Sequence, residues 1–486
     1  MKTRIFESKW VFYFIVFIFF VVFFSQVHPI APYDTDDWQN IGLERPPYPS
    51  LDCWNPTKVF PECFEPLVAT FAGYFVVPLG GDYIFGLILT NAVVVSLFII
   101  FYLLFVHAYI EKRFKLSRLT NIALMIVFIL LHFLILRSAG EKNEYLWYSH
   151  DTNCYYHYII PNMICACMVL WLMQHDLQKI RSGKTIAVLI VLTYLALCSN
   201  LYSVVILIAY IGAVLIMDML NTFKADKVWI KDYIIRNACF LSVVILWLVI
   251  QLIEASGIRA NGYGFLHEPF LHCMKITVLN FLVIRYNHWF ILITVLFIVG
   301  AKIIDFKRNG HSFLGGGYQQ WVIILSLALS TIYLIMLSSR VEPLYIQRGD
   351  VIFEYFFFYL LIVLIAMAYL CAHIKYAVSA TPLLIFFLFF QINTVGKTFK
   401  DVVEEYEPDL QTCIEIDRDI VRRICDADVA GQDSVVIYVP RYSKHSYNWP
   451  MMVTDYASQY YGKALYKHNQ TSREIRTIFI PSYVID

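Results

Sequence analysis

Long apolar segments alternate with short polar ones along most of this chain. Eleven segments are almost free of charge and are long enough, or nearly so, to cross about 30 Å of hydrocarbon as helices. A β-barrel would instead show strands of about ten residues with alternating polarity, so the pattern predicts a polytopic α-helical membrane protein. The expected spans lie at residues 10–28, 83–106, 119–136, 157–174, 185–199, 201–220, 237–255, 288–305, 320–338, 351–371 and 377–395.

For three apolar segments the sequence predicts a structure other than a single span. The block 186–220 is too long for one span and has basic residues at both ends, so we expect it to turn back at its only polar position, Ser199-Asn200. After Pro66 the apolar run to Val77 is too short to span, and we expect an interfacial or re-entrant segment. Within 257–287 apolar residues recur at near-helical spacing, which predicts a helix along the membrane surface.

The pattern changes after residue 395. The last 91 residues hold 14 acidic and 11 basic side chains, which is typical of a soluble region. Periodicity predicts a charged helix over 397–423, a strand at 434–439, an amphipathic helix over 449–466 and a second strand at 477–480. We therefore expect a transmembrane domain over 1–395 and a small C-terminal α+β domain over 396–486.

Composition and charge support this organisation. Of 486 residues 59% are hydrophobic and 15% are charged, and basic residues form no block that would indicate nucleic-acid binding. The segments assigned to the inner side hold 18 Lys and Arg, against nine in the outer loops between spans. This asymmetry predicts an inner amino terminus, and an odd number of spans then predicts an outer carboxyl terminus.

The first outer loop, residues 29–82, is the longest and holds the best candidate chemistry. Asp34, Asp36 and Asp37 follow the first span directly, and Glu44 lies further along the same loop. A carboxylate in hydrogen-bond reach of an acceptor hydroxyl can take its proton, and a neighbouring acid can bind a divalent cation such as Mg²⁺ or Mn²⁺. The alternative is a solvated acidic loop without a catalytic role.

Basic residues at the outer ends of spans run against the expected charge bias. Such a set can bind a phosphate through charge-assisted hydrogen bonds, although single members commonly snorkel at helix ends. The candidates for binding a donor phosphate are Arg137, Arg259, Lys275, Arg285, Arg340 and Arg348, with Lys142 nearby.

Aromatic and cysteine residues of the outer segments give two further sets. Aromatic rings stack on sugars, but they also form cores and interfacial belts. Candidates for contact with a saccharide are Trp38, Trp54, Trp147, Trp449 and, as a polar partner, Asp151. Two pairs, Cys53 with Cys63 and Cys413 with Cys425, could form disulfides on the outer side or remain free thiols.

An acidic pair in the first outer loop, a surface helix in a later loop, many spans and an outer tail together resemble the GT-C superfamily of membrane glycosyltransferases. The length and tail further resemble the phage and prophage serotype-converting glucosyltransferases that modify O-antigen. The motif evidence is one short stretch, Asp36-Asp37. The superfamily's commonest pair mixes Asp with Glu, so this chain departs from it, and the identity of the catalytic carboxylate stays open.

The resemblance implies a reaction and partners. Glucose or another hexose would pass from undecaprenyl-phosphate-sugar to O-antigen or a lipid-linked saccharide at the periplasmic side of the bacterial inner membrane, with a companion flippase and donor synthase. We expect Asp37 to be the base and Asp36 its orienting or metal-binding partner, with Asp34 and Glu44 in reserve. Two alternative functions stay open, a flippase or transporter of lipid-linked saccharides and an O-antigen polymerase.

Overall fold

The structure is a computed structural model of the chain. It describes residues 9–32, 35–136, 145–147, 149, 151–180, 182–223, 228–262, 268–284, 286–309, 317–374, 376–395, 410–440 and 455–483.

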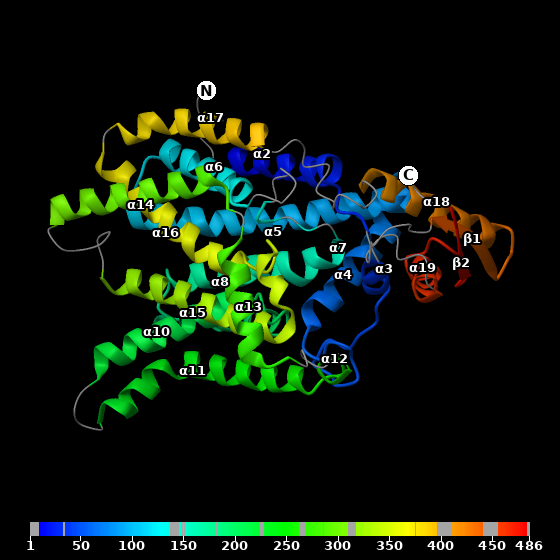
Figure 1. The fold of residues 1–486 in the computed structure, drawn as a ribbon, viewed down its shortest axis with the longest axis horizontal. Coiled ribbons are helices and arrows are strands. Elements are labelled where there is room, and N and C mark those ends of the chain that lie inside the picture. Colours follow the sequence, from blue (N-terminus) through cyan, green and yellow to red (C-terminus); the bar gives the residue numbers. More distant parts are fainter. Residues whose placement is uncertain are drawn as a thin grey trace.

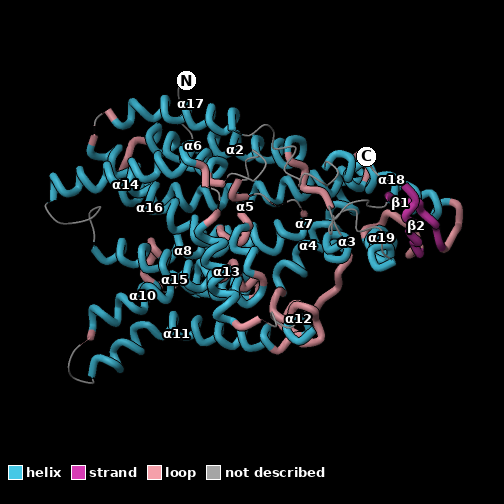
Figure 2. The backbone as a smooth tube through the Cα atoms, viewed as in Figure 1, coloured by secondary structure: helices cyan, strands magenta, loops and turns pink. Residues whose placement is uncertain are grey.

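Helices make up most of the described part of the chain, and its two strands lie together at one end (Figures 1 and 2). The helices before residue 396 are α2 (Lys9–Val22), α3 (Thr35–Ile41), α4 (Val59–Phe71), α5 (Tyr83–Phe114), α6 (Arg118–Leu134), α7 (Thr152–Cys154), α8 (Ile160–Leu172), α9 (Gly183–Leu197), α10 (Val205–Thr222), α11 (Val228–Ala255), α12 (Ile258–Gly262), α13 (Phe270–Leu282), α14 (His288–Asn309), α15 (Gly317–Val341), α16 (Phe353–His373) and α17 (Ala377–Val395). The later elements are α18 (Leu410–Val429), β1 (Ser434–Pro440), α19 (Asp455–Lys467) and β2 (Arg476–Tyr483). We call residues 410–440 and 455–483 the tail, and the end of the bundle that carries them the tail end.

Nine helices of the described residues are long and apolar enough to cross a membrane. Eight of them coincide with expected spans, which supports a membrane-embedded, polytopic helical protein. The expected spans at 119–136, 185–199 and 377–395 correspond to shorter apolar helices, Arg118–Leu134, Gly183–Leu197 and Ala377–Ile392. The turn expected at Ser199-Asn200 is confirmed, because α9 ends at Leu197 and the Asn200 side chain accepts a hydrogen bond from Tyr202 N at 2.9 Å.

The ninth candidate span, Val59–Leu79, differs from the sequence-based expectation of a short segment after Pro66. One continuous helical segment of 21 residues begins eight residues earlier, with α4 passing through a π-helical turn, Ala72–Val76, into a 3-10 turn, Val77–Leu79. Proline is tolerated in a first helical turn, where the missing N–H has no intrahelical acceptor, so Pro61 does not prevent this start. Figure 1 shows α4 running obliquely to the long helices at the tail end.

The tail forms a β-α-β unit behind a helix. Strands β1 and β2 are parallel, with Ser434 opposite Arg476 and Val439 opposite Pro481, and α19 connects them. The helices and strands therefore lie close to the segments that periodicity predicted for residues 397–480.

The tail shares a hydrophobic core with the start of the chain. Trp38 and Ile41 of α3, with Tyr83 of α5, are buried against Ile414 of α18 and Tyr461 of α19. Lys467 Nζ donates a hydrogen bond to Gly42 O at 2.7 Å, and Arg418 forms an ion pair with Asp82 at 3.2 Å. The tail thus packs directly on α3, the helix that carries the acidic pair.

Candidate functional site

Helix α3 presents its two acidic residues in different environments. Asp36 is exposed, whereas Asp37 has no exposed surface and its Oδ1 accepts a hydrogen bond from the backbone N–H of Asn153 at 2.6 Å. Trp38 of the same helix packs into the tail, whereas Asp37 contacts α7. Asp34, the third acid of the cluster, lies outside the described residues.

Asp151 is an acidic neighbour of Asp36. Its side chain is buried and caps α7 by accepting a hydrogen bond from Cys154 N at 2.5 Å. The pKa of Asp36 is raised, first by desolvation in its recessed setting and then by repulsion from the Asp151 carboxylate. Asp151 was expected at a saccharide site, and the structure brings it beside Asp36.

Two cations act on Asp36 from the other side. Lys58 and Arg259 both lower the pKa of Asp36, against the larger effect of burial. Of the described members of the expected cationic set, Arg259 is the residue that acts on Asp36 in this way. The resulting group of Asp36, Asp151, Lys58 and Arg259 is called the acid–base cluster below.

Lys58 is unusual because its side chain is buried, with 8% exposure, immediately before α4. Its ammonium group has no hydrogen-bond or ion-pair partner within the part of the chain that the structure describes. Burial, followed by repulsion from Arg259, lowers the pKa of Lys58 to about 8, while Glu254 and Glu62 raise it. A buried ammonium group with open donor positions is suited to an anion that arrives from outside.

Contacts of residues before and after Lys58 in the sequence hold the segment that carries it. Thr57 donates from its backbone N–H and its hydroxyl to Glu254 of α11, at 3.0 and 2.6 Å. Arg259 Nη1 donates to Asn55 Oδ1 at 3.1 Å. A buried ion pair between Arg45 and Glu62 supports the same segment, and Arg45 also donates to Asn55 O at 2.8 Å.

The ring of His157 is a further polar group that interacts with the cations of the cluster. The ring is buried, and its Nε2 has no hydrogen-bond partner among the described residues. Lys58, Arg259 and Arg45 all act on it electrostatically. The cluster therefore combines one exposed carboxylate with a set of nitrogen groups, which is an arrangement for proton transfer beside an anion.

The other expected cations lie differently. Arg348 forms a two-point ion pair with Asp350, at 3.0 and 2.6 Å, and its guanidinium lies 5.1 Å from the rings of Tyr158 and Tyr345. Its charge is thus already matched, although its Nη2 reaches Cys154 Sγ beside the cluster. Lys275 on α13 and Arg340 on α15 are exposed and are not among the groups that shift the pKa of Asp36. Arg137, Arg285 and the nearby Lys142 lie outside the described residues.

Two of the expected sugar-binding tryptophans are core residues in this structure. Trp147 has no exposed surface and stacks on His132, with ring centroids 4.3 Å apart. Trp38 is 1% exposed and stacks on Tyr461. Neither ring has a face open to a saccharide, so Trp38 and Trp147 are no longer candidates for contact with a saccharide. Trp54 is 45% exposed and remains accessible, and Trp449 lies outside the described residues.

Glu44 has a structural contact instead of a place in the cluster. It forms an ion pair with Lys467 of the tail at 2.7 Å, and this contact lowers the pKa of Glu44. We therefore assign Glu44 to the attachment of the tail.

All eleven cysteines are described, and all are free thiols in this structure. Cys413 and Cys425 both lie on α18, and twelve residues of helix separate their Cα atoms by about 18 Å. A disulfide needs Cα atoms closer than about 7 Å, so the expected pairing of these two is wrong. Cys53 and Cys63 are close enough to interact electrostatically, and their pairing stays a prediction.

Carboxylates that could share a metal ion are Asp36 and Asp151. Among the described residues no group of three or more His, Cys, Asp or Glu side chains is arranged to hold one. Mg²⁺ commonly binds one or two carboxylates together with substrate phosphates, so the expected divalent cation stays a prediction at this pair.

The sequence did not predict that Lys58 acts on Asp36, or that Asp36 is exposed while Asp37 is buried. Lys58 counted only as one of nine basic residues in outer loops, and Glu254 and Arg259, which act on it electrostatically, lie about 200 positions away in the sequence. The one available signal was its place at the end of a proline-rich loop, directly before an apolar helix.

Comparison with known proteins adds no assignment: no protein-family model, no curated protein and no solved structure matches this chain.

Proposed function

We propose that this protein is a membrane glycosyltransferase that uses a polyprenyl-phosphate-linked sugar as donor. The observation that carries the proposal is the acid–base cluster, in which the exposed carboxylate of Asp36 lies beside the cationic groups of Lys58 and Arg259. Glycosyl transfer from a lipid phosphate needs these two kinds of group together, because a hydroxyl proton is removed while a phosphate leaves.

In the proposed reaction, the oxygen of an acceptor hydroxyl attacks the anomeric carbon of the donor sugar. Asp36 takes the hydroxyl proton, a new glycosidic C–O bond forms, and the bond between the anomeric carbon and the phosphate oxygen breaks. The polyprenyl phosphate departs with the bonding electron pair. Lys58 and Arg259 stabilise the negative charge on the departing phosphate.

This proposal exchanges the roles expected for the acidic pair. Asp37 has no exposed surface and is bound to the Asn153 amide, which suits a residue that positions α3. Asp36 is accessible, and its raised pKa makes the carboxylate a stronger base. Asp36 is therefore the proposed base.

The finer assignment follows the family resemblance. We propose undecaprenyl-phosphate glucose, or another hexose, as donor and O-antigen or a lipid-linked saccharide as acceptor, at the periplasmic face of the bacterial inner membrane. The donor would come from a companion synthase and flippase. The tail would then be a periplasmic domain beside the acceptor.

Reconstitution tests the proposal directly. The purified protein in liposomes receives undecaprenyl-phosphate glucose labelled in the sugar, together with a lipid-linked saccharide acceptor. Wild type should transfer label to the acceptor, whereas Asp36→Asn and Lys58→Met should lower kcat by about 100-fold or more. The matched controls Asp52→Asn and Lys184→Met change exposed residues and should keep wild-type rates.

Experiments on the same vesicles distinguish the two alternative functions from sugar transfer. Movement of the lipid-linked sugar between leaflets without transfer identifies a flippase, and extension of the acceptor by whole saccharide units identifies a polymerase. If Asp36→Asn is made at wild-type level and still transfers sugar at the wild-type rate, the catalytic assignment is wrong.

A further inference from the structure

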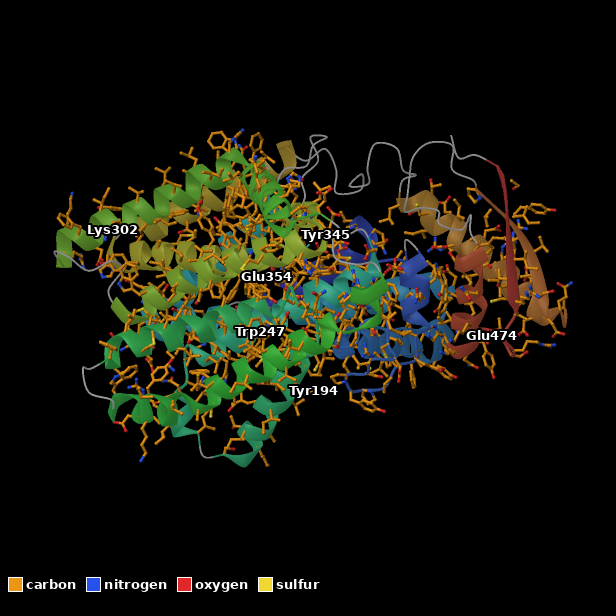
Figure 3. The ribbon with its side chains drawn as sticks, turned by 60° about the horizontal axis from the view of Figure 1, so that its bottom comes forward. Tyr194, Trp247, Lys302, Tyr345, Glu354 and Glu474 are labelled. Carbon is orange, nitrogen blue, oxygen red and sulfur yellow. The ribbon has the colours of Figure 1, made fainter. Side chains whose placement is uncertain are left out.

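A buried carboxyl group lies in the helix bundle away from the acid–base cluster. Glu354, in the first turn of α16, has no exposed surface, and Figure 3 places it within the bundle, between Lys302 at one end of the molecule and Glu474 in the tail. Neither of its carboxyl oxygens has a hydrogen-bond partner among the described residues.

Asn162 of α8 supplies a second partner-free oxygen nearby. Its Nδ2 donates to the backbone oxygen of Asp350 at 2.9 Å, and Asp350 stands four positions before Glu354. Because a carbonyl oxygen can only accept, this bond fixes the orientation of the amide, so Oδ1 points elsewhere as an acceptor. That Oδ1 is buried and has no partner in the described structure.

Glu354 lies near the face of α8 that carries Asn162, as its interaction with Cys165 indicates. Cys165 follows Asn162 by three positions, which puts both on one side of the helix, and it interacts electrostatically with Glu354. The Asp350 carboxylate also acts on Glu354, but both of its oxygens are occupied by Arg348. The local set is therefore three buried acceptor oxygens, two from Glu354 and one from Asn162, that have no hydrogen-bond partner among the described residues.

The charge of this set selects its ligand. Asp350 and Arg348 neutralise each other, and Asn162 and Cys165 are neutral, so an ionised Glu354 leaves a net charge of one negative unit. One positive unit restores neutrality, whereas a divalent ion would leave an uncompensated charge in the interior. Oxygen ligands favour hard cations over thiophilic metals.

We propose that Glu354 and Asn162 form a binding site for one alkali cation inside the helix bundle. Ionisable groups within membrane helices are costly and commonly mark ion or proton sites, which accords with a carboxyl group that otherwise has no partner. The Arg348–Asp350 ion pair, with Arg348 about a third exposed, lies close to this site in the sequence. The site does not depend on the proposed glycosyl transfer.

Thermal stability of the detergent-purified full chain tests the site. Because a ligand that binds the folded state raises Tm, NaCl or KCl should raise it by about 2–4 °C relative to choline chloride of equal ionic strength. Glu354→Gln should abolish this response, and Asn162→Ala should weaken it. Glu474→Gln, which changes an exposed carboxylate of the tail, should keep the full response.

Binding of radioactive sodium gives a second readout that does not depend on thermal stability. Wild type should bind sodium in a scintillation proximity assay, with displacement by unlabelled NaCl or KCl and none by choline chloride; the more effective displacer identifies the preferred ion. The proposal is overturned if neither NaCl nor KCl changes Tm more than choline chloride does, or if Glu354→Gln or Asn162→Ala leaves sodium binding unchanged.

Discussion

The indole of Trp38 stacks on the phenol ring of Tyr461, with ring centroids 3.8 Å apart and ring planes inclined by 22°. Tyr461 also donates a hydrogen bond from its hydroxyl to Asp417 Oδ1 at 2.8 Å, and that carboxyl group has no exposed surface. A helix that begins directly before the acidic pair is thus held by two elements of the tail, α18 and α19.

The first prediction concerns this aromatic pair. Replacing Trp38 or Tyr461 by leucine should each destabilise the contact between tail and α3 by about 2–4 kcal/mol, because a buried aromatic ring is lost. The double variant should lose about 0.5–1.5 kcal/mol less than the sum of the single losses, since stacked rings stabilise each other. Hydrogen exchange of the α19 amides measures the opening free energy, and strict additivity would show that the rings are not coupled.

The second prediction is a pH dependence centred on Asp417. Burial raises the pKa of this carboxyl group from 3.8 to about 8, although Tyr461 and Trp38 partly lower it. Between these values the unfolded state has lost the proton and the folded state retains it, so the free energy of unfolding falls as pH rises, by up to about 1.4 kcal/mol per pH unit.

Asp417→Asn removes this titration and still accepts the Tyr461 hydrogen bond. The stability of the variant should therefore depend less on pH, and its advantage over wild type should grow from about pH 5 to about pH 8. Limited proteolysis of the tail at several pH values measures the difference. A constant difference between the two proteins across that range would contradict the assignment.

The third prediction concerns anion binding by Lys58. With a pKa of about 8, the ammonium group is charged below that pH and neutral above it. Affinity for undecaprenyl phosphate, the proposed product, should thus fall as pH rises through about 8. Lys58→Arg should stay charged and keep its affinity at high pH, while Lys58→Met should bind about tenfold or more weakly throughout.

Equilibrium binding of a fluorescent undecaprenyl phosphate analogue provides the measurement. Lys184→Met serves as the matched control, because that lysine is exposed on α9. Identical pH profiles for wild type and Lys58→Arg would exclude Lys58 as the titrating group.

The fourth prediction concerns the glycine between α11 and α12. A Cβ atom at Gly257 would lie 2.3 Å from Pro56 Cγ, so Gly257→Ala must push apart the segments that carry Lys58 and Arg259. We expect a loss of about 1–3 kcal/mol in stability and weaker anion binding. Gly183→Ala is the control, because no atom lies within 4 Å of a Cβ at that position. Equal Tm values for both variants would contradict the close packing.

The sequence predicted elements well where the signal is local. Apolar length located eight of the nine candidate spans of the described residues, Ser199-Asn200 marked a turn, and short apolar segments located both strands of the tail. The helix Val59–Leu79 was missed because proline residues suggested an irregular loop, whereas Pro61 lies in a first turn that tolerates it.

The candidate site was predictable only in part, because its geometry depends on contacts between distant segments. The acidic pair indicated the region of the acid–base cluster, and Arg259 and Asp151 were both among the candidate residues. Periodicity does not reveal that Asp37 faces the Asn153 amide while Asp36 stays exposed, since that depends on how α3 is rotated by the tail. For the same reason Trp147, in a polar stretch of sequence, proved to be a core residue stacked on His132.

The contact between α3 and the tail also sets an order of assembly. Lys467 and Gly42 are 425 positions apart, so α3 leaves the ribosome on the order of half a minute before the residues that cover it. During that interval Trp38 lacks its buried partner, Tyr461. A chain that stops before α19 would carry all nine candidate spans of the described residues, yet it would expose the apolar surface of α3 that the tail otherwise covers.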